Sequence, residues 1–171
     1  HDIPFKGEVP ENITPNSPVR NYPYYMNFAG ERLLITGGGH IANRLDRPGT
    51  IMTFENNTWN SFQEEGISEQ TKHRYDDINC IVQDPKDIAH HFAASAGEGI
   101  YEFKDGKFIN WYSMHNSPLE SAVPNEPWAD SYVRVNGLIY DKENNLWMVS
   151  CETQHAVSVL TVSYTHLRAH E

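Results

Sequence analysis

The sequence has no cluster of basic residues. Its 13 lysines and arginines are scattered against 23 aspartates and glutamates, so the formal net charge is −10. Binding to nucleic acids or anionic membranes needs a basic surface that neutralises phosphates, so we expect no nucleic-acid partner. Long apolar runs are also missing: residues 146–149 form one of the longest, whereas a membrane span needs about 18 residues. No membrane insertion of this segment is expected.

Cysteine is scarce, and no N-terminal targeting pattern is present. Cys80 and Cys151 form no C-x-x-C motif. They are interpreted as two small buried hydrophobes on strands, with a disulfide or a metal role as alternatives, so their redox state is left open. The sequence starts with His1, and no basic segment followed by an apolar one comes after it. We expect that any signal peptide was removed or lies upstream.

Hydrophobic residues make up 39% and aromatic residues 12% of the chain, which indicates a globular protein with a packed core. Residues 1–20 are rich in proline and polar residues and predict an extended leader. Beyond them, short β-prone runs separated by turn residues predict an almost entirely β chain, with a short helix possible only within 63–72. The expected strands are 24–28, 32–36, 50–54, 58–62, 78–82, 91–95, 99–103, 107–112, 132–140, 146–150 and 157–160.

The chain contains internal similarity. Residues 50–62 align without a gap on 99–111, and the pair Asn56-Asn57 falls on Asp105-Gly106. Asp-Gly and Asn-rich pairs favour two-residue hairpin turns with positive φ. A second match places 81–84 on 138–141 and, after a short gap, 91–95 on 146–150. A spacing of about 50 residues with four short strands per unit is typical of β-propeller blades, and the alternative is a β-sandwich.

The length predicts an incomplete propeller. Residues 21–161 hold about three four-stranded antiparallel blades, whereas closed propellers have at least about four. The third blade, starting at 132, is expected to be truncated in its third strand. An open stack would leave an apolar blade face in water. We therefore expect the remaining blades of a longer chain as an immediate partner.

Residues 141–148, read as DKENNLWM, resemble the D-x-x-G-x-L-W repeat of two-component-regulator propellers, with Asn144 at the usual glycine. Asn tolerates the left-handed backbone that such a turn needs. The wider stretch, including 24–30, 84–87, 97–103 and 132–138, resembles the N-terminal propeller of PorZ-like proteins, which are associated with type IX secretion. The resemblance implies a periplasmic or cell-surface location. Residues 162–171 look like a translated sequencing adapter, with a genuine polar tail as the alternative.

No motif for catalysis or metal binding is evident. His90 and His91 are adjacent, so on a strand they would point to opposite faces, and a surface loop is the preferred interpretation. Gly37–Gly39 and Gly97–Gly99 are interpreted as turns, because no amphipathic helix follows them. Residues 141–145 lack the ligand spacing of a calcium loop and are interpreted as a hairpin turn. The pairs Asp76-Asp77 and Glu64-Glu65 carry no catalytic pattern. Neither a cofactor nor an enzymatic activity is predicted.

Arg134 and Asn136 are the candidate ligand-binding residues. They interrupt an apolar run on the expected strand 132–140 and would face a central channel if this strand is innermost, whereas packing or edge positions are the alternative. The preferred function is a non-enzymatic envelope module that binds a protein partner or an envelope glycan. The alternatives are the ligand-sensing propeller of a hybrid two-component regulator and a glycan-processing propeller.

Overall fold

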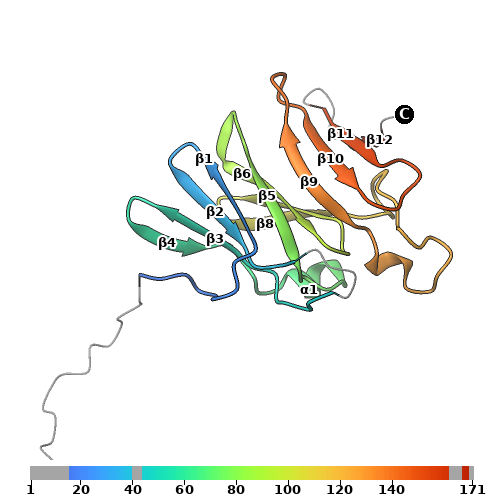
Figure 1. Ribbon diagram of the computed structural model, residues 1–171, viewed down its shortest axis with the longest axis horizontal. Coiled ribbons are helices and arrows are strands. Elements are labelled where there is room, and N and C mark those ends of the chain that lie inside the picture. Colours follow the sequence, from blue (N-terminus) through green and yellow to red (C-terminus); the bar gives the residue numbers. More distant parts are fainter. Residues whose placement is uncertain (1–15, 40–43, 162–166, 170–171) are drawn as a thin grey trace, which may run out of the picture.

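The computed structural model describes residues 16–39, 44–161 and 167–169. Three antiparallel sheets are placed next to one another, and in each sheet the strands follow the order of the sequence (Figure 1). Each sheet is therefore a simple meander of neighbouring hairpins, as the alternation of short strands and turn residues predicts. No helix in these described ranges is long and apolar enough to cross a membrane.

The first sheet contains β1 (Tyr25–Ala29), β2 (Arg32–Thr36), β3 (Ile51–Glu55) and β4 (Thr58–Ser61). The predicted Asn56-Asn57 turn joins its last two strands, with φ of 51° and 58°. Before β1, the Asn16 side chain accepts a hydrogen bond from the Trp59 amide at 2.9 Å. Residues 16–20 of the predicted leader are mostly exposed, yet one of them is bonded to the sheet. Residues 1–15 lie outside the described ranges.

The middle sheet contains β5 (Ile78–Asp84), β6 (Asp87–Ser95), β7 (Ile100–Lys104) and β8 (Lys107–Tyr112). The predicted Asp105-Gly106 turn has φ of 51° and 71°, which confirms the hairpin. A five-residue helix, α1 (Ile67–Thr71), lies between the first two sheets in sequence and within the segment where only a short helix was expected.

The third sheet contains β9 (Val135–Tyr140), β10 (Leu146–Ser150), β11 (Val157–Leu160) and β12 (Leu167–Ala169), preceded by a short 3-10 turn, η1 (Ala129–Ser131). β12 pairs with β11, so the expectation that this sheet stops in its third strand is corrected. Without β12, β11 would be an edge strand with a free row of backbone donors and acceptors, and an extended segment that follows it can pair with that row. The adapter origin of residues 162–171 stays a prediction.

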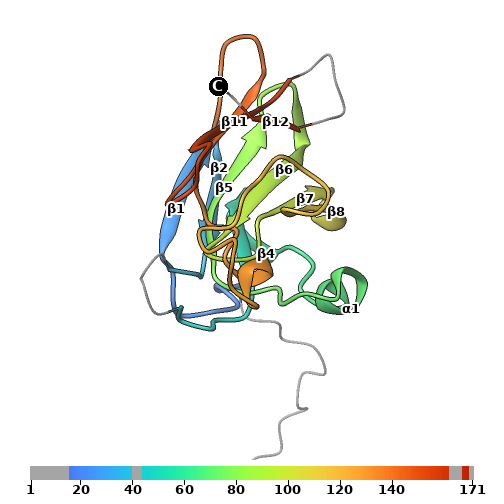
Figure 2. The ribbon, with the colours of Figure 1, turned by 90° about the vertical axis from the view of Figure 1, so that its right-hand side faces the viewer.

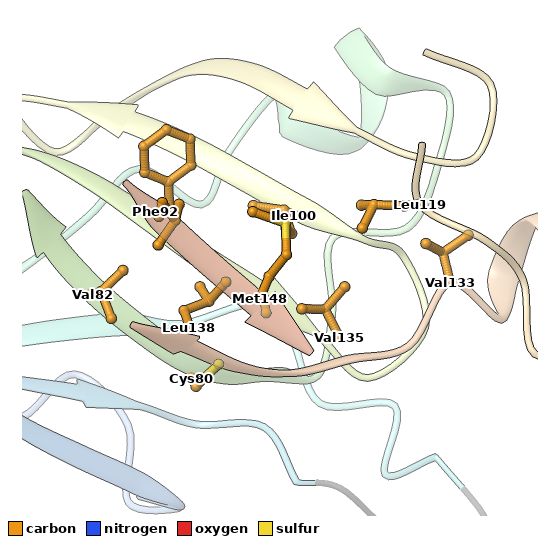
Figure 3. Close-up of a cluster of buried hydrophobic side chains, with 11 residues drawn as sticks. Cys80, Val82, Phe92, Ile100, Leu119, Val133, Val135, Leu138 and Met148 are labelled. Atoms are coloured by element: carbon orange, nitrogen blue, oxygen red, sulfur yellow. The ribbon is translucent and has the colours of Figure 1, made fainter. Parts of the chain in front are cut away.

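Both faces of the middle sheet are covered. Alternate residues of a strand point to opposite faces, so Val82 and Phe92 pack against the third sheet while Ile81 and Ala93 pack against the first. Figure 3 shows the cluster towards the third sheet, in which Phe92, Ile100 and Met148 meet between the strands. Aromatic and aliphatic side chains therefore fill both faces of the middle sheet.

Each end sheet has one face that no neighbouring sheet covers. On the first sheet, cross-strand pairing places Phe28, Leu33, Phe54 and Trp59 in one row on the face turned away from the middle sheet. On the third sheet, the corresponding row is Ile139, Trp147 and Val159. Phe28 and Ile139 are each 68% exposed. Val159 is only 9% exposed, so each outer face carries an exposed apolar side chain but is not exposed throughout.

The first strands of the three sheets lie side by side, with β5 in contact with both β1 and β9. In Figure 1 the three sheets fan out from these strands, and Figure 2 shows α1 and η1 near the same end of the stack. The geometry brings three strands that are distant in sequence to one edge of the molecule.

Candidate functional site: an inner-strand groove and a wedge pocket

A groove runs along the first strands of the sheets. Its volume is about 750 Å³, and residues of β1, β5 and β9 line it together with the β1–β2 and β5–β6 turns. We call it the inner-strand groove. Phe28, Ile88 and Ile139 line it and are 68%, 64% and 68% exposed. Exposed apolar side chains that gather at one place mark an interaction surface more often than isolated ones do.

Arg32 fixes one end of the inner-strand groove. Its guanidinium donates to the Glu55 carboxylate at 2.9 Å, to Gln83 Oε1 at 3.1 Å and to the Ile88 carbonyl at 2.7 Å. One side chain thus connects the first sheet to the β5–β6 hairpin. A planar guanidinium with several donors is suited to such a junction.

A second, smaller pocket lies between the middle and third sheets. Its volume is about 250 Å³, and we call it the wedge pocket. The pocket has an apolar wall and a polar wall. The lining residues are Asp84, His90, Phe92, Glu102, Tyr112, Tyr140, Asn144, Leu146, Leu160 and Thr161.

The polar wall of the wedge pocket is a connected hydrogen-bond network. His90 lies between two carboxylates, with Nε2 at 2.6 Å from Glu102 Oε1 and Nδ1 at 3.3 Å from Asp84 Oδ2. The Tyr112 hydroxyl donates to Glu102 Oε2 at 2.9 Å. Asn144 Nδ2 donates to Asp84 Oδ1 at 3.2 Å and so connects the third sheet to the middle one.

These contacts shift the pKa values of the side chains that line the pocket. The hydrogen bond that His90 donates to Glu102 raises the pKa of His90, which favours the imidazolium. Burial, with a further contribution from Glu102, raises the pKa of Tyr112 to about 12. Burial and then the Asp84 carboxylate raise the pKa of Tyr140. Both tyrosines therefore stay neutral hydroxyls at neutral pH.

The prediction that His90 and His91 lie in a surface loop is wrong. Both residues belong to β6, which starts at Asp87 and is longer than predicted. The expected opposite orientation is confirmed, since His90 lines the wedge pocket whereas His91 packs against Phe62 at 4.9 Å between ring centroids. The loop interpretation failed because paired strands can bury polar residues whose hydrogen bonds are provided by the adjacent strands, here Asp84 of β5 and Glu102 of β7.

Arg134 and Asn136 line neither the inner-strand groove nor the wedge pocket. Arg134 precedes β9 rather than lying within it, stacks over the Tyr132 ring at 4.8 Å and pairs with Glu152 at 2.9 Å. Asn136 is an exposed residue of β9. The structure does not bring the two residues into a common pocket among the described residues, and a ligand-binding role stays a prediction.

The carboxylates of Asp46, Asp76 and Asp77 converge closely enough for a metal ion. Their charge is, however, already opposed by arginine: Arg44 contacts Asp76 at 2.5 Å, and Arg74 contacts the other oxygen of Asp76 at 2.6 Å. A guanidinium at the same oxygens competes directly with a cation. This cluster is better described as an ionic junction of loops, to which Arg44 also adds the buried Glu98 at 2.9 Å.

The glycine-rich and Asx-rich segments have structural roles. The Gly38 amide donates to the Ile78 carbonyl at 2.8 Å, and a Cβ on Gly38 would lie 2.3 Å from the Asp77 backbone, so only glycine fits. In the β9–β10 turn, Asp141 accepts bonds from the Asn145 amide at 2.8 Å and from the Trp147 indole at 2.7 Å. The hairpin interpretation of 141–145 is confirmed.

Both cysteines are free thiols. Cys80 belongs to the buried cluster between the middle and third sheets, and burial raises the pKa of its thiol to about 12. The expectation of a small buried hydrophobe on a strand is confirmed for Cys80. Cys151 follows β10 and is only partly buried.

Sequence reasoning missed the wedge pocket, although three signals were present. The histidine pair was noticed, Asn144 was recognised at a glycine position, and Asp84 lies in a stretch that resembles a known family. Each was judged within its own segment. Asp84 and Asn144 are 60 residues apart, so their contact depends on how the sheets stack.

Comparison with solved structures is informative about the fold. No protein family and no curated protein matches the sequence. Among solved structures, PorZ, described as an essential bacterial surface component of the type-IX secretion system of Porphyromonas gingivalis, matches with a TM-score of 0.81 and 23% identity. The match covers 94% of this chain and 21% of that chain.

This similarity shows the fold. The predicted resemblance to PorZ-like proteins is confirmed at that level, whereas the resemblance to two-component regulators stays a prediction. The chain spans about a fifth of the PorZ chain, because the match covers 21% of it.

Proposed function

We propose that this chain is part of a β-propeller in a cell-surface or envelope protein of the PorZ kind, and that it binds a protein partner without catalysing a reaction. The structural match to a surface component of a secretion system supports the location and the class of function. Fold similarity alone does not assign function, so the local geometry of this chain has to support the rest.

One observation supports the propeller. Residues that are equivalent by the internal repeat occupy equivalent faces: Val82 on β5 corresponds to Ile139 on β9, and Phe92 on β6 corresponds to Trp147 on β10. The first member of each pair packs on the third sheet, and the second lies on that sheet's uncovered face. Each sheet thus presents the same face to its next neighbour, which is how successive blades pack in a propeller.

The inner-strand groove is the proposed partner site. In a fan of blades, the first strands line the centre, and loops at one end of the centre commonly carry the binding residues. The groove combines three exposed apolar side chains with the polar groups of Arg32 and Gln83. An apolar centre with a few polar groups is typical of a protein-binding surface.

A photo-cross-linking amino acid at position 88 of the full-length protein, expressed in its native host, tests this proposal. We expect a discrete cross-linked protein identified by mass spectrometry. Ile109 on β8 is the matched control, because it is also an exposed isoleucine, at 52%, and does not line the groove. Equal labelling from both positions, or a glycan as the only product at 88, would contradict a protein partner at the groove.

Recovery of the genomic reading frame is the second test. Further blades after position 161 would support the propeller of a surface component. A membrane helix followed by kinase and receiver domains would instead favour the sensor alternative.

A further inference from the structure

We propose that the wedge pocket binds a single alkylammonium group, the chemistry shared by a lysine side chain and a free diamine. This site is separate from the inner-strand groove, so the two proposals can fail independently. The argument starts from the charge of the pocket.

The wedge pocket has an uncompensated negative charge. Asp84 and Glu102 contribute two carboxylates, and the His90 ring between them can contribute at most one positive charge. No lysine or arginine is among the described residues that line the pocket. The side chains of Asp84 and Glu102 are only 15% and 14% exposed, so water screens this excess poorly. A monovalent cation would balance it.

A residue of the pocket wall also has an acceptor without a donor. Asn144 is 7% exposed, and its Oδ1 is buried with no hydrogen-bond partner among the described residues. Its orientation is fixed, because the opposite amide orientation would place an oxygen against the Asp84 carboxylate. A buried acceptor without a partner is costly, so a group that comes to face this oxygen has to be a hydrogen-bond donor.

The apolar wall favours an organic cation over a metal ion. Phe92, Tyr112 and Tyr140 line the pocket, and aromatic rings attract ammonium groups through their faces. The two carboxylates lie at opposite nitrogens of the His90 ring, so their oxygens do not converge on one point. The volume of about 250 Å³ is below the range of drug-sized ligands and suits one alkyl chain with its charged end.

Asn144 distinguishes this pocket from the corresponding position of the resembling repeat. The residue stands where the resembling repeat has glycine, and its φ is 70°, a conformation that glycine adopts at no steric cost. Asn144→Gly therefore removes the orphan acceptor and the bond to Asp84 while it keeps the turn. Such a variant separates ligand binding from folding.

Isothermal titration calorimetry of the 171-residue chain tests the proposal with two probes, Nα-acetyl-lysine-methylamide and 1,5-diaminopentane. We expect saturable binding of at least one probe, and an affinity at least tenfold lower for both Asn144→Gly and Glu102→Gln. Asn57→Gly in the β3–β4 turn, where φ is 58°, is the matched control and should change the affinity less than twofold. Binding of the lysine probe alone points to a protein side chain, and binding of the diamine points to a free amine.

Three results would overturn the proposal. The first is an equal affinity for Nα-acetyl-norleucine-methylamide, which has the same chain length without the charge. The second is an affinity that survives both Asn144→Gly and Glu102→Gln in chains with an unchanged circular dichroism spectrum. The third is no heat of binding for either probe at millimolar concentration.

Discussion

The two faces of the middle sheet are built from the same strands but differ in composition and packing. Towards the first sheet, the interface is aromatic and closely packed, with Phe103 in contact with Phe62 at 5.5 Å and with Phe108 at 6.2 Å between ring centroids. Towards the third sheet, an aliphatic cluster gives way to the wedge pocket with its charged network. The neighbouring residues His90 and His91 face these two environments. The pKa of His90 is raised, whereas the pKa of His91 is lowered.

The comparison shows that the residues on the two faces of a strand in a stacked sheet are constrained independently. Odd and even positions face different neighbours, so one face can be optimised for packing while the other keeps polar groups. The closely packed face is expected to dominate stability, and the pocket face is expected to tolerate change.

Truncation of the aromatic face should have the largest effect. Phe103 is fully buried, and Phe103→Ala should lower the free energy of unfolding by about 4 kcal/mol, because the surrounding rings cannot fill the cavity. Phe92→Ala borders the wedge pocket, where the wall can relax, and should cost about 3 kcal/mol. Urea denaturation measures both. A larger loss for Phe92→Ala would reverse the comparison.

The second-largest expected effect is a loss of stability in acid, caused by protonation of His91. Burial lowers the pKa of His91 from 6.5 to about 4. Between these values the unfolded chain binds a proton that the folded chain does not, so stability falls as the pH falls from 6.5 to about 4. The loss reaches about 3 kcal/mol. In His91→Phe, a urea titration at several pH values should show a shallower acid slope, and an unchanged slope would assign the acid sensitivity to other groups.

His90 should have the opposite effect on the pH dependence of stability. Because its pKa is raised, His90 contributes stability that is present below its ordinary pKa of 6.5 and is lost as the pH rises through its folded-state pKa. His90→Gln should cost about 1.5 kcal/mol at pH 6, where both ring nitrogens donate to carboxylates. The difference from the parent chain should shrink at pH 9. A difference that is constant with pH would show a packing role only.

Polar substitution on the uncovered faces should have the smallest effect on stability. Phe28→Ser and Ile139→Ser, each at a side chain that is 68% exposed, should change the free energy of unfolding by less than about 0.5 kcal/mol. The double variant should self-associate less, because it removes two exposed apolar side chains that lie on the uncovered faces and also line the inner-strand groove. Sedimentation velocity at several concentrations measures this, and the same association in both chains would locate the contact elsewhere.

Local chemistry made much of the fold predictable. Asn56-Asn57 and Asp105-Gly106 adopt the positive φ that their residue types favour, and β2 and β8 have the predicted bounds. Errors arose where pairing with a neighbour extends or starts a strand, as at the beginning of β6 and in β12. A hydrogen-bonded ladder continues as long as the partner strand offers groups, which the residues of one segment do not encode.

The sequence by itself determined that the chain is all-β, where its hairpins turn and which strands repeat, because turn conformation and strand alternation depend on residues close along the chain. Only the tertiary structure decided that Asp84, Glu102 and Asn144 meet around His90, and that β1, β5 and β9 share one groove. Such sites form where separate sheets stack. Their geometry depends on the packing of whole faces, and the spacing of residues along the chain does not record it.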